Sequence, residues 1–195
     1  MGIWKKPELS ANMIFICLSL PDVSLKNGTI LNIKIFLLED LVDKLNNISE
    51  KYKFDKSKLA IEITEDAIEK DRETAKRNVE LCKELGFKVY LDDLGCGYTS
   101  LSNLCDYPID VVKLDRDILL KTDSKRGKDL FSGIVALAHS LNTSVICEGV
   151  ETEEQNDFVS KSGCDYIQGW YYAKAIPLEE CEAFIEKHAL KYSCS

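Results

Sequence analysis

The sequence has no surplus of basic residues, no paired cysteine motif and only two histidines. A formal charge of -8 argues against a surface that coats DNA or RNA, because nonspecific phosphate binding needs a basic face. None of the eight cysteines lies in a Cys-x-x-Cys pair, so we expect reduced core thiols in a cytoplasmic protein. His139 and His188 lie in helix-like segments, and we do not expect histidine-based hydrolysis.

Long apolar runs are missing as well. The segment Met13–Leu20 follows Lys5 and Lys6 and imitates a signal peptide, but it is only eight residues long and no clean cleavage site follows it. No other segment approaches the length of a membrane span. The sequence therefore predicts neither secretion nor a membrane segment.

Strand-like and helix-like segments alternate along the chain, which predicts a mostly parallel α/β sheet or barrel in one domain over residues 1–195. We count about six strands. A complete (β/α)8 barrel needs ~250 residues, so we expect an incomplete TIM-like barrel that lacks its first strand-helix unit. The expected strands are residues 13–20, 59–63, 87–91, 109–114, 144–148 and 166–167.

Helix boundaries are marked by capping residues. A helix is expected over residues 38–52, where leucines recur at helical spacing. Asp71 and Ser124 are predicted caps of two further helices, and Gly86 stands where the first of these stops. Thr152 and Gln155 form a capping-box pattern before a short helix, and Pro177 precedes a last helix.

Polar residues stand where the expected strands end. Because parallel strands bring their carboxyl ends to one face, these side chains are expected to share one pocket. They are Glu62, Asp92, Asp93, Lys113, Glu148 and Gln168.

The acidic members of this set point to a cation. Four carboxylates that converge repel one another unless cations lie between them, and hard oxygen ligands favour Mg²⁺ or Mn²⁺. Adjacent aspartates such as Asp92 and Asp93 can bridge two metals for phosphodiester hydrolysis, with Lys113 orienting or deprotonating the attacking water. Taken alone, the pair of aspartates is also compatible with a solvated turn or a helix cap.

The motifs in their order along the chain resemble the EAL domain family, with the matches spread over residues 59–177. They are Glu62-Ile-Thr-Glu65, Asp92-Asp93-Leu-Gly-Cys-Gly-Tyr-Thr-Ser, Lys113-Leu-Asp115, Glu148-Gly-Val-Glu151 and Gln168-Gly169. This resemblance implies a modified (β/α)8 barrel that hydrolyses cyclic di-GMP to a linear dinucleotide, pGpG, with Mg²⁺ or Mn²⁺.

The resemblance also implies a role for each matching residue. Glu62, Asp92 and Asp93 are implied metal ligands, Lys113 and Glu148 the catalytic pair around metal and water, and Gln168 a supporting residue. Glu65 and Glu151 are implied supports of the loop that follows Asp93, with helix capping or exposure as the alternative for both. Trp170, Tyr171 and Tyr172 can stack a guanine or belong to the core, so the substrate-binding residues are left open.

The departures from the family pattern bear on activity. The Glu-Ala-Leu motif is absent, and Cys17 stands where the resemblance calls for a metal-binding Asn, with residues 25–34 as an apparent insertion. A thiol is a poor ligand for Mg²⁺.

Two functions of different class follow from these departures. One is an active or weakly active phosphodiesterase; the other is a degenerate module that binds cyclic di-GMP, or only a protein partner, without turnover, and we favour the second. A domain that has lost all ligand binding is a third alternative. An open barrel also predicts a homodimer or another self-association, through the open edge or residues 95–101. Flanking GGDEF or sensory domains are the further partners that the resemblance implies.

Overall fold

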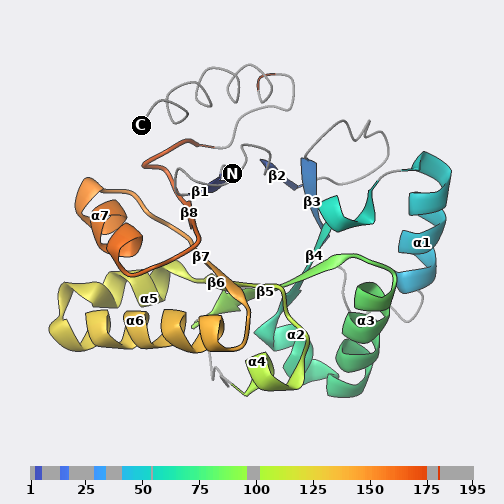
Figure 1. The fold of residues 1–195 in the computed structure, drawn as a ribbon, viewed down its shortest axis with the longest axis horizontal. Helices are drawn as coiled ribbons and strands as arrows, with labels where there is room; N and C mark the ends of the chain where they lie inside the picture. The colour runs from blue at the N-terminus through green and yellow to red at the C-terminus, as the bar shows by residue number, and fades with distance from the viewer. Residues whose placement is uncertain are drawn as a thin grey trace.

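The computed structural model describes residues 3–5, 14–17, 29–33, 41–53, 55–95, 102–174 and 180. Its strands surround a common centre and its helices lie outside them (Figure 1). This arrangement is the α/β barrel class that the alternation of segments predicts.

One sheet contains all eight described strands, in the order β1-β8-β7-β6-β5-β4-β3-β2. Each strand pairs in parallel with its neighbours, except that β1 pairs antiparallel with β8. The strands are β1 Ile3–Lys5, β2 Ile14–Cys17, β3 Thr29–Ile33, β4 Ala60–Thr64, β5 Lys88–Leu94, β6 Val111–Leu114, β7 Ser144–Cys147 and β8 Tyr166–Gln168.

Helices cover the outside of the sheet. They are α1 Leu41–Tyr52, α2 Glu65–Lys70, α3 Arg72–Glu84, α4 Asn103–Asp106, α5 Arg116–Leu120, α6 Lys125–Ser140 and α7 Glu153–Lys161, with 3-10 turns η1 Lys56–Lys58 and η2 Lys121–Asp123. The predicted caps are confirmed, because Asp71 accepts from the amide of Thr74 and Ser124 from that of Gly127. Thr152 and Gln155 form the complete capping box of α7.

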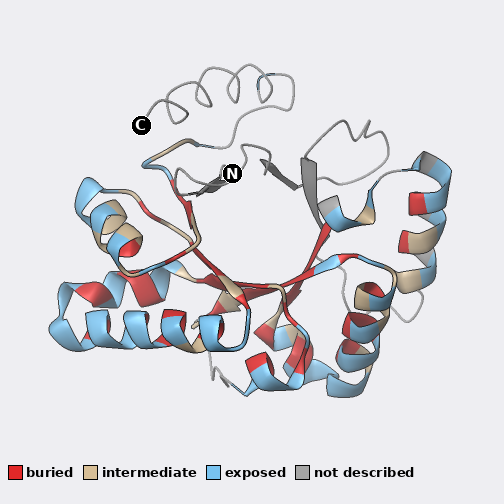
Figure 2. Ribbon diagram, viewed as in Figure 1, coloured by how far each residue is buried: buried red, intermediate tan, exposed pale blue. Residues whose placement is uncertain are grey.

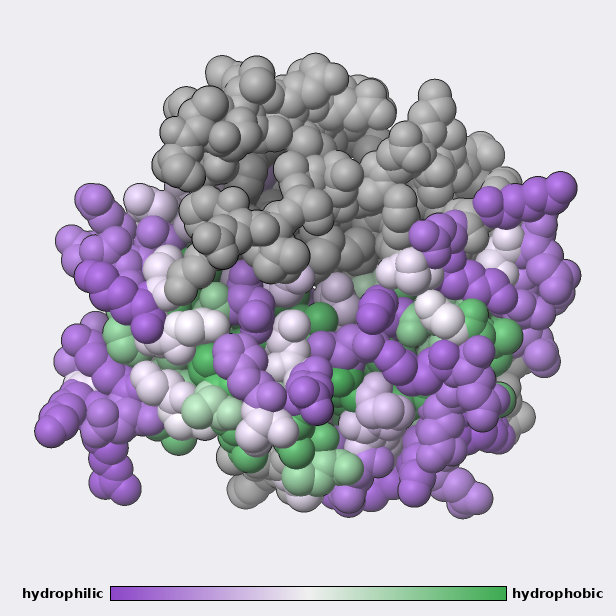
Figure 3. Space-filling model, viewed as in Figure 1, coloured by the Kyte–Doolittle hydropathy of each residue, from purple (hydrophilic) through white to green (hydrophobic). Residues whose placement is uncertain are grey.

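Two apolar layers hold the sheet in place. The larger one lies between the strands and the helices, and includes Phe87, Leu91 and Phe131. The smaller one gathers Ala60, Tyr90, Val111 and Ile146 in a separate cluster, as expected for residues that alternate between the two faces of each strand. Buried residues therefore concentrate on the strands and on the helix faces turned toward them (Figure 2). On the face seen in Figure 3, hydrophilic side chains cover most of the described surface.

The amino-terminal part of the sheet differs from the sequence prediction. The expected count of about six strands is wrong, because β1 and β3 add to the strands that the sequence marks. The stretch 25–34, expected to be an insertion, contains β3, and this strand rather than β2 pairs with β4. Cys17 therefore lies in a strand that is separated from β4, and Asn32 lies in the strand beside it.

Some expectations fall outside the description or need correction. The last helix after Pro177 lies outside the described residues. Among the cysteines whose side chains are described, all free, Cys82, Cys147 and Cys164 are buried as expected, but Cys105 is exposed because it lies on the solvent side of the short helix α4. Within the described part of the chain, every helix is too short or too polar to span a membrane.

Candidate metal centre at the carboxyl end of the sheet

The Lys113 side chain lies at the centre of a buried cluster of charges. Its ammonium contacts Asp92 Oδ1 at 2.7 Å, Glu148 Oε1 at 2.8 Å and Glu62 Oε1 at 2.9 Å. The side chains of Glu62 and Asp92 are each only 1% exposed, and that of Lys113 is 6% exposed. Three of the predicted acidic residues, far apart in the sequence, thus meet around the ammonium of a fourth predicted site residue.

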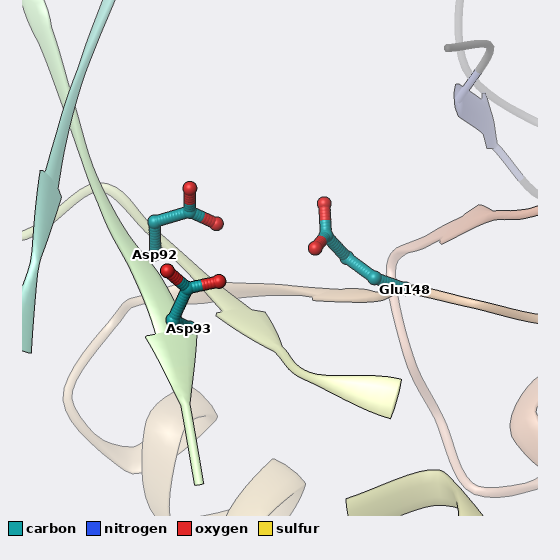
Figure 4. A group of neighbouring side chains, drawn as sticks. All are labelled: Asp92, Asp93 and Glu148. Carbon is teal, nitrogen blue, oxygen red and sulfur yellow. The ribbon is translucent and has the colours of Figure 1, made fainter. Parts of the chain in front are cut away.

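A β-bulge brings the fifth site residue into the cluster. In a regular strand, Asp92 and Asp93 would point to opposite faces of the sheet. The pairing of β5 with β6 shifts register between Leu91 and Leu94, and Asp93 has a positive φ of 61°. Such a bulge re-aims a side chain. One carboxylate oxygen from each of Asp92, Asp93 and Glu148 consequently lies within 4.8 Å of the others (Figure 4).

The glycine after this pair is required by packing as well as by backbone conformation. Gly95 has a φ of +107°, and a Cβ built there would lie 2.3 Å from Ile118 Cγ1 on α5. Because position 95 has no side chain, the chain can pass close to α5 as it leaves β5. Residues 96–101, which follow, lie outside the described residues.

The cluster carries more negative than positive charge. Its acids are Glu62, Asp92, Asp93 and Glu148, and Lys113 is the basic member. Burial raises the pKa of the Glu148 carboxyl; Asp92 and Asp93 add to this effect, and the Lys113 ammonium only partly opposes it. Burial acts to lower the pKa of Lys113, but the three surrounding carboxylates outweigh it and raise that pKa above its ordinary value.

This charge surplus fits a divalent cation. Asp92, Asp93 and Glu148 supply hard oxygen donors, the ligands that Mg²⁺ and Mn²⁺ prefer. Like charges held this close disfavour one another's ionised form, and an added cation relieves that repulsion. In this structure the Lys113 ammonium supplies the positive charge at the centre of the cluster.

The supporting residues have different surroundings. Gln168 is buried at the end of β8, and Glu65 is buried at the first position of α2. Glu151 is not buried: its Oε2 accepts from Arg116 Nη2 at 2.7 Å. The part of the loop that Glu65 and Glu151 were expected to support beyond Gly95 lies outside the description, so that role stays a prediction.

The aromatic run after Gln168 is mostly outside the core. Trp170 is 63% exposed and Tyr171 is 40% exposed. Tyr172 is partly buried against the core and donates its hydroxyl to Asn156 Oδ1. For Trp170 and Tyr171, the alternative of core residues is therefore wrong.

Arg116 lies next to the site, and the sequence alone did not point to it. Its ion pair with Glu151 joins residues 35 positions apart. A lone arginine after a strand carries no sequence signal of its own, although its fixed distance from Lys113 would have placed it at the carboxyl end of the sheet.

Comparison with known proteins places this chain in a family of barrel domains. A sequence model described as the EAL domain matches residues 19–175. The probable cyclic di-GMP phosphodiesterase PdeB of Escherichia coli K12 is 32% identical over 150 residues, covering 77% of this chain and 28% of PdeB. The cyclic di-GMP phosphodiesterase NbdA of Pseudomonas aeruginosa is 32% identical over 149 residues, covering 76% of this chain and 19% of NbdA.

Solved structures share the same fold. The structure of the PaMucR phosphodiesterase in complex with c-di-GMP superposes with a TM-score of 0.72 at 30% identity. The similarity covers 78% of this chain and 63% of that one. The chain thus spans only a fifth to a little over a quarter of the curated relatives named above, and somewhat less than two thirds of the PaMucR chain.

Proposed function

Because this chain belongs to the EAL domain family, we propose that its carboxylate cluster is the metal site of a cyclic di-GMP phosphodiesterase. The observation that carries the proposal is the meeting of Asp92, Asp93 and Glu148 within 4.8 Å at the carboxyl end of the sheet. That end is where α/β barrels build their active sites. Relatives named as phosphodiesterases of cyclic di-GMP support the choice of substrate.

Each residue has a role in hydrolysis to the linear dinucleotide. Glu62, Asp92 and Asp93 would hold Mg²⁺ or Mn²⁺, and a bound ion would supply a Lewis acid for the phosphoryl oxygen and a more acidic water. Lys113 orients the attacking water and balances the negative charge that develops on the phosphate. Glu148, which lies 2.8 Å from Lys113 and beside Asp92 and Asp93, would contribute to the network of metal and water.

The asparagine that the family resemblance calls for is Asn32 in this proposal. Strand β3 pairs with β4, and Asn32 is in register with Ala60. Residues alternate between the two faces of a strand, so position 32 belongs to the same face of the sheet as position 62. The sequence-based argument for a lost ligand rested on Cys17, which lies one strand further away.

A non-catalytic module is the second candidate function. The observation in its favour is that no Glu-Ala-Leu motif occurs within residues 1–195. A site with an incomplete ligand set can still bind cyclic di-GMP, because binding needs fewer groups than a two-metal reaction.

The experiment is chromatography of cyclic di-GMP after incubation with the protein and Mn²⁺, paired with equilibrium dialysis of the same nucleotide. The variant Asp92→Ala removes a buried cluster carboxylate, and Asp129→Ala, an exposed aspartate on α6, is the matched control. Linear product with wild type and Asp129→Ala, but not with Asp92→Ala, supports the phosphodiesterase. Retained nucleotide without product supports the binding module. Neither product nor binding overturns both.

The proposal extends to the surroundings of the domain. We place it in the cytoplasm, with GGDEF or sensory domains as partners, and we expect it to self-associate. Among the described strands, β1 and β2 each pair with a single neighbour, and we propose that another copy covers one of these edges. Sedimentation equilibrium tests the last point, and a monomer at all concentrations would contradict it.

A further inference from the structure

The turn that carries Glu148 is held from one side by β8. The Val150 amide donates to the Gln168 carbonyl at 3.1 Å, and the Tyr171 amide donates to the Val150 carbonyl at 3.0 Å. A Cβ at Gly169 would lie 1.9 Å from that same carbonyl oxygen, so the two segments are in close contact. These backbone hydrogen bonds therefore hold the turn against β8 and the residues that follow it.

On the other side, Arg116 spans the turn. Its guanidinium contacts Glu151 at 2.7 Å, and Glu151 in turn donates its amide to Gln155 Oε1 at 2.8 Å. The stem of Arg116 lies against Gly149, because a Cβ built there would meet the arginine Cβ, Cγ and Cδ at 2.7, 2.8 and 3.1 Å. Arg116 thus touches the residue after Glu148 and pairs with the residue three positions after it.

Arg116 is also close in sequence to the centre of the site. It begins α5, three residues after Lys113, and the Glu148 amide donates to the carbonyl of Leu114 at 3.0 Å. The same short stretch of chain therefore carries Lys113, fixes the backbone of Glu148 and provides the side chain that spans its turn.

We propose that Arg116 is a positioning residue, which holds the turn from Glu148 to Glu151 so that the Glu148 carboxylate stays against Lys113 and beside Asp92 and Asp93. This inference rests on the proposed metal site. The ion pair itself is partly exposed, with side chains 47% and 30% accessible, so it adds little to global stability. Its effect is local: outer contacts of this kind set the geometry of the groups that bind a metal.

The test uses Arg116→Ala, which removes stem and charge, and Arg116→Lys, which keeps both with a shorter reach. Arg126→Ala, an exposed arginine on α6, is the matched control. Three quantities are measured on the full chain: the Mn²⁺ dissociation constant by calorimetry, hydrogen exchange of the Glu148 amide without metal, and the urea midpoint. For Arg116→Ala we expect Mn²⁺ binding about tenfold weaker and amide exchange faster by a similar factor, with the urea midpoint unchanged. We expect Arg116→Lys to restore most of the Mn²⁺ affinity and most of the protection of the Glu148 amide, and Arg126→Ala to match wild type.

The outcomes separate this inference from the proposed function. Wild-type exchange and wild-type Mn²⁺ affinity in Arg116→Ala overturn the positioning role, and so does an equal effect of Arg126→Ala. If wild type itself binds no Mn²⁺, the proposed function is wrong, and the positioning role is then tested by amide exchange alone. Faster Glu148 exchange in Arg116→Ala then still supports the positioning role, and unchanged exchange overturns it.

Discussion

The two ends of the sheet use the same kinds of residue in opposite ways. At the amino end, Asp110 precedes β6 and accepts from Lys83 at 2.6 Å, Lys88 at 3.2 Å and the Val89 amide at 2.8 Å. Asp165 precedes β8 and accepts from His139 at 2.9 Å and the Val145 amide at 2.8 Å. Each aspartate there has a basic partner and fixes the start of the neighbouring strand.

At the carboxyl end the balance is reversed. Lys113 forms ion pairs with three carboxylates, and Asp93, in a strained backbone conformation, lies in the same cluster. Charge that is matched stabilises a fold, whereas charge that is unmatched and buried persists where it has a function. In barrels the amino end serves stability and the carboxyl end serves chemistry, and the distribution of charge in this chain matches that division.

The largest expected effect comes from removing the shared cation. Lys113→Met leaves the buried Glu62 and Asp92 and the partly buried Glu148 without their counterion, and we expect a loss of about 3–5 kcal/mol in the free energy of unfolding. Urea unfolding of the metal-free protein measures it. A loss below about 1 kcal/mol, the size typical of an exposed pair, would mean that Lys113 does not neutralise the cluster.

At the amino end, we expect a smaller loss in the free energy of unfolding and no change in metal binding. Asp110→Ala leaves the Val89 amide and the Lys83 ammonium without their acceptor, and we expect a loss of about 1–3 kcal/mol. Mn²⁺ affinity should not change, because Asp110 lies at the opposite end of the sheet. An equal fall in metal affinity would contradict the separation of the two ends.

The same aspartate predicts a pH dependence. Burial alone would raise the pKa of Asp110, but Lys83, the Val89 amide and Lys88 together lower it below the ordinary value of 3.8. Its folded pKa is depressed, so its contribution to stability is complete above about pH 4 and is lost as the pH falls through the folded pKa. The stability difference between wild type and Asp110→Asn should therefore be constant from pH 5 to 7, on the order of 1 kcal/mol, and shrink below pH 4. A difference independent of pH would contradict this.

The smallest expected effect has the opposite sign. Asp93→Asn keeps the size of the side chain, and asparagine tolerates the positive φ at this position. Removing one charge from the surplus should stabilise the metal-free protein by about 0.5–1 kcal/mol while Mn²⁺ binding weakens. Asp129→Asn on the exposed face of α6 is the control and should change neither quantity. If Asp93→Asn destabilises the metal-free protein, the cluster is not under electrostatic strain.

Local signals in the sequence predicted much of this structure. Asp71, Ser124 and the pair Thr152 and Gln155 cap helices where expected, since a cap depends only on residues within one turn. The convergence of Glu62, Asp92, Lys113 and Glu148 followed from the rule that parallel strands end on one face.

Features that depend on pairing across the sheet were not predictable in this way. The sequence does not identify β3 as a strand of the sheet, because nothing local shows that it separates β2 from β4. The bulge that turns Asp93 toward Glu148 is a property of the β5–β6 register, and the contact of Arg116 with Glu151 spans 35 residues. Each needs two distant segments to be placed together.

The central claim is that the carboxyl-end cluster binds a divalent cation and the amino-end aspartates do not. Thermal unfolding with increasing Mn²⁺ tests it directly in wild type, Asp92→Asn and Asp110→Asn. A cation present at a hundred times its dissociation constant stabilises the folded state by about 2.7 kcal/mol. We expect this gain for wild type and Asp110→Asn and none for Asp92→Asn. An equal gain in all three proteins, or a gain in none, would contradict it.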